Sequence, residues 1–180
     1  MSLSATEGPL LLIGFGNELR GDDGAGCRVA RRLQGGLGRR LGRSAVVLVV
    51  PQLLPELAEP IGRARLVIFV DASCVLSPGQ VQRSELRAAA GAGSSLGHHL
   101  SAEGLLGMAR ALYGRAPSAW LYAIGGGCFG HRTDLSATAR RAVGRVVRDI
   151  AARTRHVSSA SRRGNAAGWC AHGARAKRPL

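Results

Sequence analysis

The chain has 180 residues, about the size of one domain, with 46% hydrophobic residues and a formal net charge of +14. No apolar run approaches the roughly 20 residues that a membrane-spanning helix needs, so we expect a cytoplasmic protein without a membrane partner. The cysteines form no CxxC pair, and their wide spacing is unlike a disulfide framework, so we expect four free thiols: Cys27, Cys74, Cys128 and Cys170.

Half of the positive charge lies near the C-terminal end. Seven basic residues and no acidic residue follow position 150, namely Arg153, Arg155, Arg162, Arg163, Arg175, Lys177 and Arg178. A net charge of +7 is left on residues 1–150, where the basic residues fall on expected helix faces without interleaved aromatic residues. The strong preference for arginine over lysine looks like a compositional bias, and we therefore expect no nucleic-acid partner.

Hydrophobic patterning predicts alternating strands and helices. Buried strands are expected at residues 10–13, 45–50, 66–70 and 120–124, and a weaker alternation makes residues 81–86 a candidate edge strand. Helical periodicity covers residues 23–33, 54–61, 101–113 and 136–153, and Ser101 and Ser136 are typical N-cap residues for the last two. This alternation predicts an α/β protein: a three-layer α/β/α sandwich with a mostly parallel, twisted sheet of about five strands.

The hydrophobic periodicity ends near His156. Beyond it the sequence is rich in Ser, Gly, Ala and Arg, and Trp169 is an isolated aromatic residue. We therefore predict one domain over residues 1–156, followed by a basic disordered tail over residues 157–180.

A glycine-rich segment follows the first expected strand and leads into the first expected helix, over residues 13–26. A dinucleotide-binding fingerprint would need a glycine where the chain has Leu19. The adjacent carboxylates of Asp22 and Asp23 would also repel a bound phosphate, so the loop favours a cation. A nucleotide-binding α/β enzyme is the alternative that the glycines alone support.

Three further side chains make this loop a candidate metal site. Asp71 ends an apolar strand, at the edge of an α/β sheet where ligands bind, although on its own it is equally suited to cap the next turn. His98 and His99 stand just before an expected helix. Carboxylate oxygens and an imidazole nitrogen together suit a divalent transition metal with open positions for substrate, which points to Asp23, Asp71 and one histidine.

Residues 14–26 read G-x-G-N-x-L-x-x-D-D-G-x-G, residues 70–72 read V-D-A, and a histidine precedes an amphipathic helix. With the phrase at residues 52–59, these motifs resemble the [NiFe]-hydrogenase maturation endopeptidases over roughly residues 10–150. The resemblance implies a metal-dependent, aspartate-type endopeptidase, and we expect it to act as a monomer. It implies that the enzyme removes a C-terminal extension from the precursor of a hydrogenase large subunit. It also implies no organic cofactor, because nickel carried by the substrate is recognised by Asp23, Asp71 and His98.

Several alternatives stay open at this point. The family often has glutamate where Asp23 stands, and Asp22 is the neighbour that would take its place. His99 is the alternative to His98, which we prefer because Leu100 follows it at the family's spacing. A thiol of Cys74 or Cys128 is a further candidate ligand or nucleophile, with His131 nearby. Functionally, the alternative to a protease is a non-catalytic metal chaperone or docking factor for hydrogenase assembly.

Overall fold

The computed structural model describes residues 8–41, 44–89 and 100–154. Their five strands form one sheet: β1 (Leu10–Phe15), β2 (Ala45–Val50), β3 (Leu66–Ser73), β4 (Val81–Leu86) and β5 (Ser118–Gly125). The strand order is β2-β1-β3-β5-β4, with all neighbours parallel except β4, which is antiparallel to β5. The mostly parallel five-stranded sheet and the edge strand at residues 81–86 are thus confirmed.

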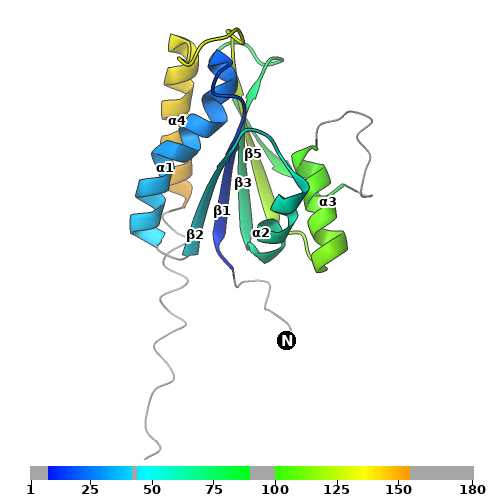
Figure 1. Ribbon diagram of the computed structural model, residues 1–180. Coiled ribbons are helices and arrows are strands. Elements are labelled where there is room, and N and C mark those ends of the chain that lie inside the picture. Colours follow the sequence, from blue (N-terminus) through cyan, green and yellow to red (C-terminus); the bar gives the residue numbers. More distant parts are fainter. Residues whose placement is uncertain (1–7, 42–43, 90–99, 155–180) are drawn as a thin grey trace, which may run out of the picture.

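Helices cover both faces of this sheet (Figure 1). α1 (Ala25–Leu41) and α4 (Ala137–Arg153) pack on one face, and α2 (Ala58–Arg63) and α3 (Ala102–Tyr113) on the other. Alternate residues of β1 feed the two cores: Leu10 and Leu12 pack in the layer of α1 and α4, and Leu11 and Ile13 in that of α2 and α3. The three-layer α/β/α sandwich is confirmed.

Serine caps begin two of the helices as predicted. The Ser101 hydroxyl accepts a hydrogen bond from the Gly104 N–H at 3.1 Å, and the Ser136 hydroxyl accepts one from the Ala139 N–H at 3.2 Å. Each cap satisfies a backbone donor that the first turn leaves without a partner. These caps fix where α3 and α4 start.

Several boundaries differ from the sequence-based prediction. The first helix starts two residues later, after a 3-10 turn η1 (Gly21–Gly24), and runs to Leu41 because Leu33 and Leu37 continue its buried stripe. The predicted helix at residues 54–61 divides into a 3-10 turn η3 (Pro55–Leu57) and the short α2. β3 runs beyond residue 70, so Asp71 lies within the strand and not on the loop after it.

The predicted basic tail at residues 157–180 lies outside the described residues, and so does the predicted domain boundary at residue 156. Within the described ranges, no helix is long and apolar enough to cross a membrane.

Candidate active site

The start of α1 lies directly over the carboxyl ends of β1 and β3. A Cβ atom on Gly26 would collide with the backbone carbonyl oxygens of Phe15 and Val70, so only glycine permits this approach. The glycines of the motif therefore serve close packing of helix on sheet. The consequence is that the 3-10 turn η1, which carries Asp22 and Asp23, lies beside the end of β3.

Asp23 is half-buried in η1, and a hydrogen bond fixes its orientation. Its Oδ2 atom accepts a hydrogen bond of 2.9 Å from the backbone N–H of Asn17. Gly16 has a φ of +128°, and a Cβ there would collide with the Asp23 carbonyl oxygen. The loop therefore folds back tightly on itself and holds the Asp23 carboxylate at the carboxyl edge of the sheet.

Backbone N–H groups of this loop already have partners inside the protein. Gly21 donates to the Arg132 carbonyl at 2.7 Å, and Asp22 donates to the Cys128 carbonyl at 2.8 Å. A phosphate cradle needs free N–H groups that converge on the anion. The geometry therefore argues against the nucleotide-binding alternative.

Asp71 is paired in register with Ala123 of β5, near the end of β3. Strand alternation turns its side chain to the sheet face that carries α2 and α3, because Phe69 packs in that layer. Its Oδ1 atom accepts a hydrogen bond of 2.8 Å from the Ala72 N–H. Burial raises the pKa of the Asp71 carboxyl to about 7, even though this hydrogen bond lowers it.

Asp23 and Asp71 interact electrostatically. The negative charge of Asp23 adds to the rise in the pKa of Asp71, so the two carboxylates lie within electrostatic reach of each other. Two like charges at the edge of a sheet favour a cation or a shared proton between them. The turn η1, which carries Asp23, also packs against β3, which carries Asp71, so two of the three predicted side chains stand at the same edge of the sheet.

Asp22 has a structural role that the sequence did not reveal. Its side chain is fully buried, and its two oxygens accept hydrogen bonds from the backbone N–H groups of Gly127, Cys128 and Ser136 at 2.9, 3.1 and 2.7 Å. Burial by itself raises the pKa of this carboxyl, but the hydrogen bonds outweigh it and the pKa is lowered. With its oxygens engaged in this way, Asp22 is a poor replacement for Asp23.

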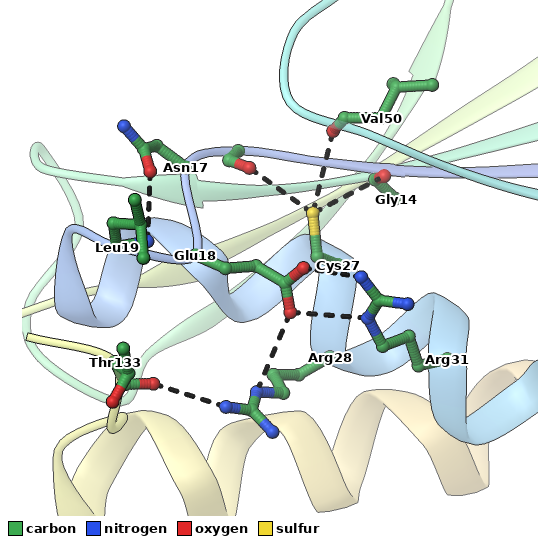
Figure 2. Close-up of polar contacts among 10 residues, drawn as sticks. Gly14, Asn17, Glu18, Leu19, Cys27, Arg28, Arg31, Val50 and Thr133 are labelled. Carbon is green, nitrogen blue, oxygen red and sulfur yellow. Dashed lines mark hydrogen bonds and ion pairs between the residues drawn. The ribbon is translucent and has the colours of Figure 1, made fainter.

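Cys27 lies fully buried below the same loop (Figure 2). Its Sγ atom lies 3.3 Å from the carbonyl oxygen of Gly16 and 3.5 Å from that of Val50, with a third carbonyl, of Gly14, at 3.8 Å. Burial, with a smaller contribution from the charge of Glu18, raises the pKa of this thiol to about 11. A neutral, enclosed thiol is a hydrogen-bond donor and not a nucleophile. No pattern in the sequence pointed to this role.

The other thiol candidates do not assemble a site. Cys74 is exposed, and Cys128 accepts a hydrogen bond of 3.5 Å from the Arg132 guanidinium. His131 is exposed on the same loop as Cys128. Within the described part of the chain, no three His, Cys, Asp or Glu side chains are grouped so that they could hold a metal, and the three cysteines described there are free.

The predicted histidine cannot be placed. His98 and its alternative His99 both lie outside the described residues, although the chain returns at Leu100 just before α3. α3 packs on the sheet face toward which Asp71 points. The described residues offer two candidate ligands at this edge, the carboxylates of Asp23 and Asp71.

A cavity of about 350 Å³ lies elsewhere on the molecule. It is lined by residues of β3, β4 and β5 and of the end of α4, namely Leu66, Ile68, Arg83, Trp120, Tyr122, Arg153 and Thr154. These residues stand toward the amino ends of the parallel strands, whereas the carboxylates stand at the carboxyl ends. We therefore base the site on the carboxylate pair and not on this cavity.

Known structures share this architecture. The hydrogenase maturating endopeptidase HybD from E. coli is 19% identical with a TM-score of 0.68, over 83% of this chain and 93% of that chain. A HycI maturation protease from Thermococcus kodakarensis is 23% identical with a TM-score of 0.63, over 79% and 90% of the two chains. A hydrogenase 2 maturation peptidase from a Thaumarchaeota archaeon is 25% identical with a TM-score of 0.59, over 79% and 95%.

No protein-family model matches the sequence, and no curated protein matches it. The structural matches span most of both chains, so the likeness extends over the whole sandwich and not over a single βα unit. The resemblance found in the motifs is thereby confirmed at the level of architecture: the chain has the fold of the [NiFe] hydrogenase maturation proteases.

Proposed function

We propose that this protein is an endopeptidase that removes a C-terminal extension from the precursor of a [NiFe]-hydrogenase large subunit. The observation that carries the proposal is the packing of η1, which carries Asp23, against β3, which carries Asp71, at the carboxyl edge of the sheet. The fold shared with structures named as hydrogenase maturation proteases supports it. The assignment of a hydrogenase precursor as the substrate is based on those names and on the sequence motifs.

In this proposal the metal belongs to the substrate. Nickel already inserted in the precursor is recognised by Asp23, Asp71 and His98, with His99 as the alternative imidazole. Because the described residues supply two ligands, the precursor itself would fill the remaining coordination positions. A precursor without nickel lacks this anchor, which gives the enzyme a way to reject an immature client.

Hydrolysis needs a nucleophile, and water fits this site better than a side chain does. Water adds to the scissile carbonyl carbon, the C–N bond breaks, and the proton lost by the water passes to the departing amine. A divalent metal lowers the barrier by polarising the carbonyl or by acidifying the water. One of the two carboxylates is also placed to accept the proton. The buried thiol of Cys27 is held neutral by its raised pKa, so it is not a candidate nucleophile.

The test is to incubate the protein with nickel-loaded and with nickel-free precursor and to measure the intact mass of the precursor. We expect a shortened product from the nickel-loaded form only. Equal cleavage of both forms would contradict recognition through nickel. Binding of the precursor without any change in its mass would replace the protease with the non-catalytic chaperone or docking factor.

A further inference from the structure

The two helical layers of the sandwich differ sharply in charge. α1 and α4 together carry ten arginines and one acid: Arg28, Arg31, Arg32, Arg39, Arg40, Arg140, Arg141, Arg145, Arg148, Arg153 and Asp149. The opposite layer carries two arginines and three acids on η3, α2 and α3: Arg63, Arg110, Glu56, Glu59 and Glu103. A bias in amino-acid composition would enrich both layers alike. The arginines are therefore not explained by composition alone, contrary to the expectation from the sequence.

The arginines of α1 and α4 form one surface, because the two helices pack side by side on the same face of the sheet (Figure 1). Four of them, Arg32, Arg39, Arg141 and Arg148, are exposed and make no hydrogen bond or ion pair with any part of the chain that the structure describes. Arg32 and Arg39 are seven residues apart on α1, and Arg141 and Arg148 are seven residues apart on α4. The two side chains of each pair therefore lie on the same side of their helix. We call the nine arginines of α1 and α4 with described side chains, all but Arg40, the arginine face.

The arginine face is continuous with the candidate active site. The Arg28 guanidinium donates a hydrogen bond of 3.2 Å to the carbonyl of Thr133, in the loop that Asp22 anchors (Figure 2). Glu18, in the loop that carries Asp23, pairs with Arg31 at 2.7 Å and with Arg28 at 4.0 Å. A large molecule held at Asp23 and Asp71 therefore has this face as an immediate neighbour.

We infer that the arginine face is a docking surface for an acidic patch on the folded body of the precursor, while the precursor's C-terminal segment occupies the Asp23 and Asp71 edge. The inference rests on the proposed function, since it assigns a second contact to the same client. Arginine suits this role because its planar guanidinium pairs with carboxylates through two hydrogen bonds. Opposite charges over a broad surface accelerate encounter by about 10-fold to 1000-fold.

Other polyanions fit less well. Binding to a lipid surface needs apolar side chains that insert, and unstructured nucleic acid needs aromatic side chains for stacking. Among the described side chains, the exposed large hydrophobic residues are Leu19, Val46, Leu54, Val75, Leu112 and Tyr113, and none of them lies on α1 or α4. The arginine face adjoins the sheet edge that carries Asp23 and Asp71, so the protein substrate fits it better than a lipid surface or a nucleic acid does.

The experiment compares two charge reversals of equal size. Arg32→Glu/Arg141→Glu alters the arginine face, and Arg63→Glu/Arg87→Glu alters exposed arginines elsewhere. Processing of nickel-loaded precursor is followed at about 10 mM and about 1 M salt, where the Debye length is about 30 Å and about 3 Å. At low salt we expect kcat/KM to fall at least about fivefold for the first variant only, with kcat unchanged and the difference lost at high salt.

Arg32→Gln/Arg141→Gln serves as a milder version if the glutamates disturb folding, and it is expected to show a smaller loss of the same kind. Equal kcat/KM for the arginine-face and control variants would overturn the docking inference and leave the proposed function intact. The docking inference would likewise be overturned if the arginine-face variant lost binding to duplex DNA or to anionic vesicles but still processed the precursor at the full rate. If the unaltered protein processes no precursor, the proposed function and the inference both fall.

Discussion

The buried carboxylate of Asp22 accepts a hydrogen bond of 2.7 Å from the backbone N–H of Ser136, although the two residues are 114 positions apart. This bond and those from Gly127 and Cys128 fasten the loop after β5 to the loop after β1. The two loops that border the candidate active site therefore form one structural unit.

Replacing Asp22 should destabilise the protein. Asp22→Asn keeps the shape but turns an amide N–H₂ group toward backbone donors, so we expect the free energy of unfolding to fall by about 2–3 kcal/mol. Urea unfolding followed by circular dichroism measures this. Asp134→Asn is the control, because this carboxylate is exposed on the loop after β5. It should change stability by less than about 0.5 kcal/mol. Similar losses for both variants would show that the buried hydrogen bonds contribute little.

Asp71 should make the metal-free protein less stable as the pH rises. Its folded pKa of about 7 lies above the ordinary value of 3.8, so ionisation costs the folded state free energy between these two pH values. Asp71→Asn removes that cost, and we expect its melting temperature to exceed the unaltered protein's by roughly 5 °C at about pH 8 and by little below about pH 4. Scanning fluorimetry with a chelator present tests this, and a pH-independent difference would contradict it.

Asp149 provides the opposite case for the same pH series. Burial raises the pKa of this carboxyl, but hydrogen bonds from Arg153 and Tyr122 outweigh it and the pKa is lowered. Its ionised form therefore stabilises the fold above the ordinary pKa, and this contribution is lost as the pH falls. Asp149→Asn should lower the melting temperature at neutral pH, by less and less as the solution is acidified.

The three proposed ligands should be essential for processing and dispensable for folding. We expect Asp23→Asn, Asp71→Asn and His98→Ala each to lower processing of nickel-loaded precursor at least about 100-fold, because each removes a contact to the metal or to the reacting water. Intact-mass measurement of the precursor gives the rates, and circular dichroism checks the fold. His99→Ala is the matched control; loss of activity in this variant with full activity in His98→Ala would move the ligand by one residue.

Two glycines of α1 should respond oppositely to alanine. Gly26→Ala places a methyl group against the carbonyls of Phe15 and Val70, so we expect a loss of at least about 2 kcal/mol of stability and reduced processing. Gly36→Ala meets no atom within 4 Å and should stabilise the helix by about 0.5–1 kcal/mol. Chemical unfolding of the two variants separates these effects. Equal behaviour would mean that α1 does not rest on the strand ends as described.

Removal of residues 157–180 should leave processing unchanged, because the predicted domain ends at residue 156. Steady-state processing by the truncated and the full-length chain is the measurement. A truncated chain that folds but processes precursor more slowly would assign a role to the basic tail.

The patterns that predicted the fold were those that depend on neighbours in sequence. Apolar runs and serine caps located the strands and helices, since burial and capping act over a few residues. The roles of Asp22 and Cys27 could not be found in this way, because their partners at Ser136 and Val50 are distant in the chain. The adjacent Asp22 and Asp23 were the one available signal, since neighbouring side chains in a tight turn point in different directions.

The strand predicted at residues 66–70 was also too short, because β3 runs on to Ser73. The apolar run ends at Val70, but hydrogen bonding to β5 continues through Ala72 and Ser73, which a hydrophobicity pattern does not detect. The position near the edge of the sheet was nevertheless predicted correctly. The histidine ligand stays a prediction, because residues 98 and 99 lie outside the described chain.

The order of the strands has a consequence for synthesis of the protein. β4 has β5 as its neighbour in the described sheet, and β5 also closes the free side of β3, yet β5 is the last strand to leave the ribosome. Until then β3 has an unpaired edge and β4 has no strand to join. Chains that stop before residue 118 should therefore be retained by chaperones or degraded, and Asp71 reaches its final surroundings only after β5 has emerged and paired with β3.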